Sequence, residues 1–340
     1  MPERVLVTGV SGFVGGHTAL QLLDAGYIVR GSVRDLKKGD KVRETLARHG
    51  ADVSRLEFAV LDLMRDEGWA EAMRGVRYLH HIASPLVLVM PKDSMELVRP
   101  AVEGTTRALE SAFHADVERV VMTSSLSAMM YGHSKTRTAP ITAADWTNLE
   151  SPDINAYIES KTKAEKAAWS IAEKHGRMKD LVTINPGGIF GPLLDEDPGT
   201  TAELIVRMLS GKAPAVPKIR AIVTDVRDVA AAHVAAMTSP NAGGRRFPIG
   251  SATHSLMEIA QMLRTSIPER AGKLPRMELP DWFTRFYATF DKEVRGSLCE
   301  LGYNRSTEAI DAKALLGRPL IPAEDAIAVT GRTVISQRLA

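Results

Sequence analysis

Tyr157 and Lys161 are the two side chains in this sequence whose types and spacing best suit acid–base chemistry. Residues four positions apart lie on one face of a helix, so the phenol and the amine come close together. A free phenol titrates near pH ~10, and a neighbouring ammonium favours the phenolate. The pair therefore predicts that Lys161 lowers the pKa of Tyr157, so that the phenol exchanges protons near neutral pH. An ordinary solvated helix face is the alternative.

The first residues of the chain predict a strand, a glycine turn and a helix. An apolar run at residues 4–7 is followed by glycines at positions 9, 12 and 15 and by an amphipathic stretch that ends near residue 25. Gly9 permits a sharp turn, Gly12 lets backbone N–H groups approach a pyrophosphate, and Gly15 lets the helix pack on the strand. With this flanking structure, the triplet favours a dinucleotide-binding loop over a simple tight turn.

The next predicted strand ends in Arg34, where a site for NAD would carry an acidic residue that binds the ribose 2′-hydroxyl. Lys37, Lys38 and Lys41 add positive charge to the same loop, although Asp35 reduces it. Such a loop suits a 2′-phosphate and predicts NADPH over NADH. A solvated, basic start of a helix is the alternative.

Composition limits the classes of protein to consider. The chain has 340 residues, 44% of them hydrophobic, and a net charge of +2, without the basic stripe that nucleic-acid binding needs. No apolar run approaches the ~20 residues that span a bilayer. Cys299 is the only cysteine, which argues against internal disulfides and favours a cytoplasmic protein. We expect no metal, no membrane and no nucleic acid, and a monomer or homodimer.

Alternating strand and helix patterns predict a doubly wound, parallel α/β sheet of the Rossmann type. Strands are expected at 4–8, 27–33, 55–61, 77–82, 117–123 and 181–185, and helices at 12–25, 66–74, 94–114 and 154–175. After Pro186, glycines and prolines interrupt the pattern, which indicates a smaller, discontinuous substrate domain. We therefore assign residues 1–186 and 221–240 to the Rossmann domain, and residues 187–220 and 241–340 to the substrate domain.

Two further groups of residues have competing interpretations. Ser124, Ser125 and Ser127 follow a predicted strand, where a hydroxyl can polarise a substrate carbonyl or simply bond local backbone. An aromatic stripe at helical spacing can pack the small domain, cover the pocket or join two copies, and packing is the default. The stripe consists of Trp282, Phe283, Phe286, Tyr287 and Phe290.

The glycine loop, Thr123-Ser124-Ser125 and Tyr157-x-x-x-Lys161 occur in the order and setting typical of extended short-chain dehydrogenases/reductases. Within that family the chain resembles the branch of dihydroflavonol reductases, cinnamoyl-CoA reductases and aldehyde reductases. The block from Tyr157 to Trp169 carries the most specific part of the resemblance, which covers nearly the whole chain.

The resemblance implies a role for each matching residue. Ser125 would bind the carbonyl, Tyr157 would donate the proton, and Lys161 would hold the ribose and tune the tyrosine. Contacts with NADP(H) are implied for Gly9, Ser11, Gly12, Phe13, Val14, Gly15, Arg34, Lys41, Asp62, Leu63, Ala83, Ser84, Tyr157, Lys161, Pro186, Gly187 and Ile189. Contacts with the substrate are implied for Ser84, Pro85, Ser127, Met130, Tyr131 and Gly188.

Met130 stands where the plant flavonoid enzymes of this branch have an asparagine that reads the catechol ring. An apolar, adaptable pocket for a small hydrophobic carbonyl or alcohol is therefore expected. The sequence as a whole predicts an NADPH-dependent reductase that converts an aldehyde or ketone reversibly to an alcohol. A nucleotide-sugar epimerase or dehydratase that retains its NAD, and a non-enzymatic protein that senses NADP, are the alternatives.

Overall fold

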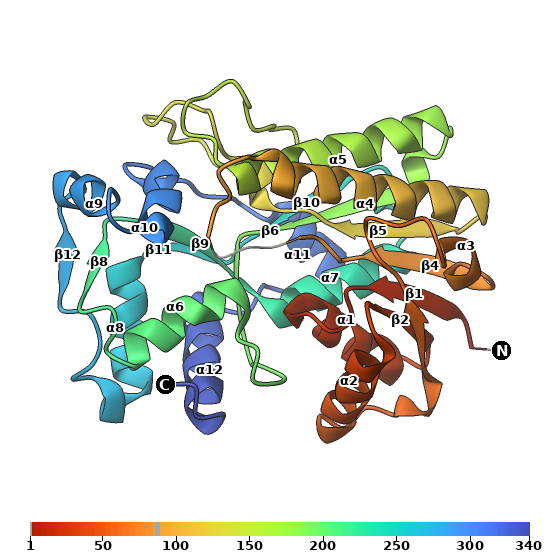
Figure 1. The fold of residues 1–340 in the computed structure, drawn as a ribbon, viewed down its shortest axis with the longest axis horizontal. Helices are drawn as coiled ribbons and strands as arrows, with labels where there is room; N and C mark the ends of the chain where they lie inside the picture. Colours follow the sequence, from red (N-terminus) through yellow and green to blue (C-terminus); the bar gives the residue numbers. More distant parts are fainter. Residues whose placement is uncertain (1, 86–88) are drawn as a thin grey trace.

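The computed structural model describes residues 2–85 and 89–340. A seven-stranded sheet forms its centre, and all neighbouring strands within it pair in parallel (Figure 1). The order across the sheet is β10-β6-β5-β4-β1-β2-β3. These strands are β1 (Arg4–Thr8), β2 (Ile28–Val33), β3 (Leu56–Val60), β4 (Val76–His81), β5 (Arg119–Thr123), β6 (Leu181–Pro186) and β10 (Arg246–Ile249). The predicted doubly wound α/β fold is confirmed.

Helices cover both faces of this sheet, because its strands are apolar on both sides (Figure 1). On one face lie α3 (Trp69–Ala72), α4 (Met95–His114) and α5 (Ala156–Lys174). On the other face lie α1 (Phe13–Asp24), α2 (Leu36–Arg48), α7 (Val226–Thr238) and α11 (Ile310–Leu316). The alanine-rich helix α7 packs against this second face.

The remaining elements gather beside the carboxyl ends of the central strands, at the left of Figure 1. Their short strands are β7 (Gly188–Phe190), β8 (Ala215–Pro217), β9 (Arg220–Asp225), β11 (Ala252–Ser255) and β12 (Met277–Leu279). Their helices are α6 (Gly199–Leu209), α8 (Leu256–Ser266), α9 (Asp281–Tyr287), α10 (Lys292–Gly296) and α12 (Ala323–Ser336). A separate apolar core joins α6, α8 and α12.

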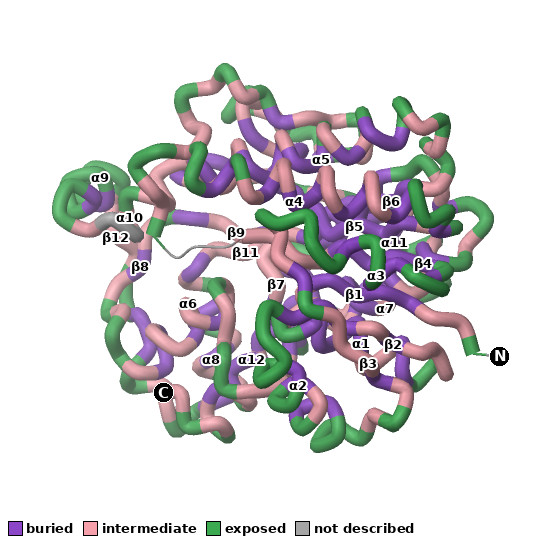
Figure 2. Tube along the Cα trace, turned by 45° about the vertical axis from the view of Figure 1, so that its right-hand side comes forward, coloured by how far each residue is buried: buried purple, intermediate pink, exposed green. Residues whose placement is uncertain are grey.

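Figure 2 shows buried positions concentrated along the central strands, and exposed ones on outer elements such as α9. In the aromatic stripe, Trp282 is 70%, Phe286 57% and Phe290 75% exposed. The default interpretation of the stripe as core packing is therefore wrong for these three rings. The short helix α9 buries one side only and leaves the others in solvent. Phe283 and Tyr287 instead line the cavity described below.

The division into two domains remains a prediction. The strand β10 hydrogen-bonds along β6 at the edge of the central sheet, although it lies within the range 241–340 that we assigned to the substrate domain. None of the helices in the described ranges combines the length and apolarity needed to cross a bilayer.

Candidate active site

A cavity of about 1620 Å³ opens at the carboxyl ends of the central strands. The chain crosses from β3, at one edge of the sheet, to β4 beside β1, and this change of direction creates a crevice where ligands bind in such folds. The loops after β1, β4, β5 and β6 all contribute to the lining. Every residue for which we predicted a ligand contact lines this cavity except Lys41.

The glycine loop has the shape that a pyrophosphate requires. Gly9 has a φ of +71°, and its carbonyl accepts a hydrogen bond from the Gly12 N–H at 3.0 Å. A Cβ atom at Gly15 would lie 2.1 Å from the Gly9 carbonyl oxygen, so only glycine fits there. Helix α1 begins at Phe13 without a side-chain cap, which leaves N–H groups of its first turn for an anion. The residues present therefore fit a dinucleotide.

The adenosine end of the cavity carries positive charge. Arg34, directly after β2, and Lys38, in the first turn of α2, both line the cavity. Lys41 does not, and its ammonium lies 3.7 Å from the carboxylate of Asp195. Lys38 belongs to the same group of lysines in the sequence. It lines the cavity where we had expected Lys41. Asp62, after β3, also lines this end.

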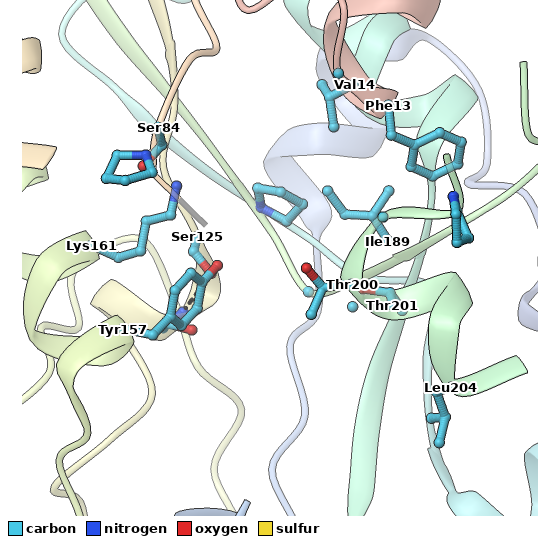
Figure 3. Close-up of a pocket in the computed structure, with 18 of the residues that line it drawn as sticks. Phe13, Val14, Ser84, Ser125, Tyr157, Lys161, Ile189, Thr200, Thr201 and Leu204 are labelled. Atoms are coloured by element: carbon cyan, nitrogen blue, oxygen red, sulfur yellow. Dashed lines mark hydrogen bonds between the residues drawn. The ribbon is translucent and has the colours of Figure 1, made fainter. Parts of the chain in front are cut away.

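Helix α5 places the phenol and the amine. Asn155 caps this helix by accepting a hydrogen bond from the Ile158 N–H at 2.9 Å, which puts Tyr157 in the first turn. The Lys161 ammonium lies 5.9 Å from the centre of the Tyr157 ring. Ser125 follows β5, and its side chain is hydrogen-bonded to Tyr157. Figure 3 shows the three side chains gathered at one wall of the cavity.

Burial dominates the protonation of both groups. It raises the pKa of Tyr157 above its ordinary value of 10, against the opposing effect of the hydrogen bond with Ser125. Our prediction that the pKa of Tyr157 is lowered is therefore wrong for this structure, because removal of the phenolate from water outweighs any help from the amine. Burial also lowers the pKa of Lys161 from 10.5 to about 8, while Glu165 raises it.

This burial makes the stability contribution of Lys161 depend on pH. Below pH 8 the amine is charged in both native and unfolded chains, so the native state carries the full cost of burying the charge. Between pH 8 and 10.5 the unfolded chain binds more protons than the native one, so stability rises with pH. We expect Lys161→Met to raise the free energy of unfolding by up to about 3 kcal/mol at pH 7. Urea titrations across this range should show the gain shrinking, and a gain independent of pH would refute the argument.

Glu165 joins helix α5 to residues in or directly after the three strands β5, β6 and β10. Its side chain is fully buried and accepts hydrogen bonds from several donors. These donors are Ser124 Oγ at 2.5 Å, Arg246 Nε at 2.6 Å, Asn185 Nδ2 at 2.8 Å, Thr183 Oγ1 at 3.1 Å and Trp169 Nε1 at 3.3 Å. The Asn185 amide also donates to the Ser125 carbonyl at 3.3 Å. This network fixes the serine loop relative to Tyr157 and Lys161.

Backbone contacts shape the wall between the two ends of the cavity. The Thr8 hydroxyl accepts hydrogen bonds from the Ile82 and Ala83 N–H groups, both at 3.0 Å, and so ties the loop after β4 to the glycine loop. Gly187 follows β6, and a Cβ atom there would lie 2.3 Å from the Ile222 carbonyl oxygen. Close backbone packing therefore explains this glycine.

The far part of the cavity contains residues that lie outside the three family motifs. Beside the predicted Met130 and Tyr131, it is lined by Asn155, Phe283, Tyr287, Cys299, Glu300 and Arg305. Asn155 carried a usable signal, since asparagine is a preferred N-cap immediately before a helical pattern. Phe283 and Tyr287 belong to the aromatic stripe, for which covering the pocket was one of the alternatives, whereas Cys299, Glu300 and Arg305 belong to no recognisable motif. Within the described ranges, no group of three or more potential ligands is arranged to hold a metal ion.

Comparisons with known proteins agree with this geometry. The model of the NAD dependent epimerase/dehydratase family matches residues 5–250. Tetraketide alpha-pyrone reductase 2 of Arabidopsis thaliana is 35% identical over 78% of this chain and 83% of its own length. Cinnamoyl-CoA reductase CAD2 of Medicago truncatula is 34% identical over 78% and 81%. The crystal structure of Gre2 from Candida albicans in complex with NADPH superimposes with a TM-score of 0.81 at 26% identity, and covers 99% of both chains.

The matched residues include the glycine loop, the serine run and the Tyr157/Lys161 pair, so the family match rests on the same elements that form the cavity. The chain belongs to the NAD dependent epimerase/dehydratase family of extended short-chain dehydrogenases/reductases, and its relatives include the cinnamoyl-CoA reductase branch that its sequence resembles.

Proposed function

We propose that this protein is an NADPH-dependent reductase that converts a hydrophobic aldehyde or ketone to an alcohol, reversibly. The observation that carries the proposal is the convergence of Ser125, Tyr157 and Lys161 at one wall of a cavity whose other end has a glycine loop and basic residues. Relatives at 34–35% identity are named reductases, and a solved structure at 26% identity contains NADPH. These similarities support both the reaction and the cofactor.

Each side chain has a proposed task. NADPH would supply the hydride that reduces the carbonyl carbon. Ser125 and Tyr157 donate hydrogen bonds to the carbonyl oxygen, where negative charge grows as the reaction proceeds. A raised pKa keeps the Tyr157 phenol protonated at neutral pH, which is the state that a proton donor needs. Lys161 holds the ribose and, when charged, favours the phenolate that remains after proton transfer.

The proposal is tested by following NADPH absorbance with a panel of hydrophobic aldehydes and ketones. We expect turnover with at least some members, and the reverse reaction with NADP⁺ and the matching alcohols. Cofactor binding without turnover of any carbonyl would count against a reductase. An oxidised sugar intermediate with tightly held NAD would instead indicate an epimerase or dehydratase.

Arg34 is expected to determine the preference for NADPH. A guanidinium at this position would form charge-assisted hydrogen bonds with the 2′-phosphate that NADH lacks. We expect Arg34→Ala to weaken NADPH binding about 10- to 100-fold and to leave NADH binding nearly unchanged, as measured by cofactor fluorescence. Lys37→Ala is the matched control, because Lys37 is a neighbouring exposed cation outside the cavity lining. Equal weakening of both cofactors by Arg34→Ala would contradict the assignment.

The domain assignment is proposed in the same terms. Residues 1–186 with 221–240 would carry the cofactor, and residues 187–220 with 241–340 would shape the substrate end. The contribution of Phe283, Tyr287 and Glu300 to the cavity supports this division of labour, because all three come from the C-terminal segment.

A further inference from the structure

A cluster of charged and aromatic residues lines the substrate end of the cavity. Glu300 lies at the end of a short 3₁₀ segment, Leu298–Glu300, and lines the cavity. Its Oε1 accepts a hydrogen bond from the Tyr131 hydroxyl, and its Oε2 accepts one from Arg305 Nη1 at 3.0 Å. The carboxylate is therefore held from two sides by donors on separate segments.

The Arg305 guanidinium of this cluster is held in place by stacking against two tyrosine rings. The Arg305 guanidinium carbon lies 4.2 Å from the centre of the Tyr131 ring and 3.6 Å from that of Tyr303. The Tyr303 hydroxyl donates in turn to Asp153 at 2.8 Å. The Arg305 side chain is 10% exposed on this platform, so its position and that of Glu300 are defined before any ligand binds.

The cluster adjoins the helix that carries Tyr157. The Asn155 side chain, which caps α5, donates to the Gly296 carbonyl at 3.2 Å and to Cys299 Sγ at 3.4 Å. Cys299 Sγ lies 3.9 Å from Glu300 Oε1. A continuous chain of contacts therefore connects the carboxylate to the first turn of α5. Tyr157 and Glu300 both line the same cavity.

The chemistry of the cluster selects what it can bind. A carboxylate offers about four lone-pair positions, of which Tyr131 and Arg305 use two, and the Glu300 side chain remains 24% exposed. The remaining lone pairs of the carboxylate can only accept hydrogen bonds. Because Arg305 already neutralises the negative charge of Glu300, a substrate ammonium would gain little electrostatic attraction here. A substrate anion would be repelled by the carboxylate. Burial raises the pKa of Cys299 to about 12, so the thiol adds no charge. A neutral hydroxyl is the group that fits.

We propose that Glu300 is the polar anchor of the substrate pocket and accepts a hydrogen bond from a hydroxyl group of the substrate. The inference rests on the proposed reductase function and narrows its substrates to hydrophobic carbonyl compounds that carry a hydroxyl apart from the reacting carbonyl. Apolar lining from Met130, Leu279 and Phe283 surrounds the remainder of the molecule. Aryl aldehydes and ketones with a ring hydroxyl combine these features.

The test compares aryl carbonyls in pairs, each with a ring hydroxyl or with a methoxy group at the same position, which cannot donate. We expect the parent protein to prefer the hydroxyl member of at least one pair by about 10- to 100-fold in kcat/KM. Calorimetry with the parent protein and the corresponding alcohol products should show the same preference in Kd. This measurement requires neither turnover nor a substituted protein.

Glu300→Gln keeps the size of the side chain and removes its charge, and we expect it to reduce this preference to less than about threefold. Glu118→Gln is the matched control, since Glu118 forms an ion pair with Arg77 outside the cavity lining and should preserve the preference. Equal use of both members of every pair by the parent, or an unchanged preference in Glu300→Gln, would overturn the inference. Absence of NADPH oxidation with all carbonyls would instead refute the reductase function itself.

Discussion

Tyr157→Phe is expected to lower kcat/KM for carbonyl reduction by about 10²- to 10⁴-fold. The substitution removes the hydroxyl that would donate the proton and a hydrogen bond to the developing alkoxide, and it keeps the ring. The phenol lines the cavity and is hydrogen-bonded to Ser125. Steady-state kinetics with the best substrate of the panel, at saturating NADPH, measures the effect.

Two controls separate this chemical role from a structural one. The affinity for NADPH and the melting temperature of Tyr157→Phe should stay close to those of the parent, because ring packing is retained. Tyr27→Phe removes a phenol outside the cavity lining and should preserve full activity. A Tyr157→Phe variant with parental kcat/KM would exclude proton donation by this residue and would favour a protein that only senses the cofactor.

Glu165→Ala is expected to reduce the free energy of unfolding by about 3–5 kcal/mol. The substitution leaves the Arg246 guanidinium, whose side chain is 9% exposed, without its buried counter-charge. Removal of one member of a buried ion pair lowers the free energy of unfolding by more than the intact pair adds to it. The reason is that the remaining charge stays buried without a counter-charge. Urea unfolding followed by circular dichroism measures the difference. Activity should fall as well, because Ser124 and Asn185 lose the same acceptor.

The pair can also be removed together. Glu165→Met combined with Arg246→Met should destabilise the protein less than the sum of the two single substitutions, since no buried charge remains. Glu71→Ala breaks an ion pair with Arg74 in which both side chains are more than 70% exposed, and it should leave stability unchanged. A Glu165→Ala variant that unfolds at the same urea concentration as the parent would show that the network has no structural importance.

The central sheet could be predicted because its strands carry long apolar runs and its first turn requires glycine. Six of its seven strands appear in the sequence as such runs, whereas β10 does not. That strand has four residues, Arg246 to Ile249, and contains Pro248. Proline is tolerated there because β10 pairs with β6 alone, at the edge of the sheet. Only the three-dimensional arrangement reveals that a short segment with a proline completes the sheet.

The predicted part of the site consists of residues in motifs whose spacing reflects local structure. Tyr157 and Lys161 share a helix face, and Ser125 follows a strand, so sequence patterns bring them to the cavity. Glu300 and Arg305 approach Tyr131 across about 170 residues of chain, and no local pattern encodes that contact. The direction of the Tyr157 pKa shift also depends on burial, which spacing does not specify.

The most direct test of hydride transfer to a carbonyl uses NADPH labelled with deuterium at the transferring position of nicotinamide C4. With a hydroxylated aryl aldehyde, we expect one deuterium on the carbinol carbon of the alcohol and one NADP⁺ released for each product molecule, as measured by mass spectrometry. The account would be contradicted if the alcohol contained no deuterium whichever face of nicotinamide C4 carried the label. Conversion of a sugar nucleotide without net NADPH oxidation would contradict it as well.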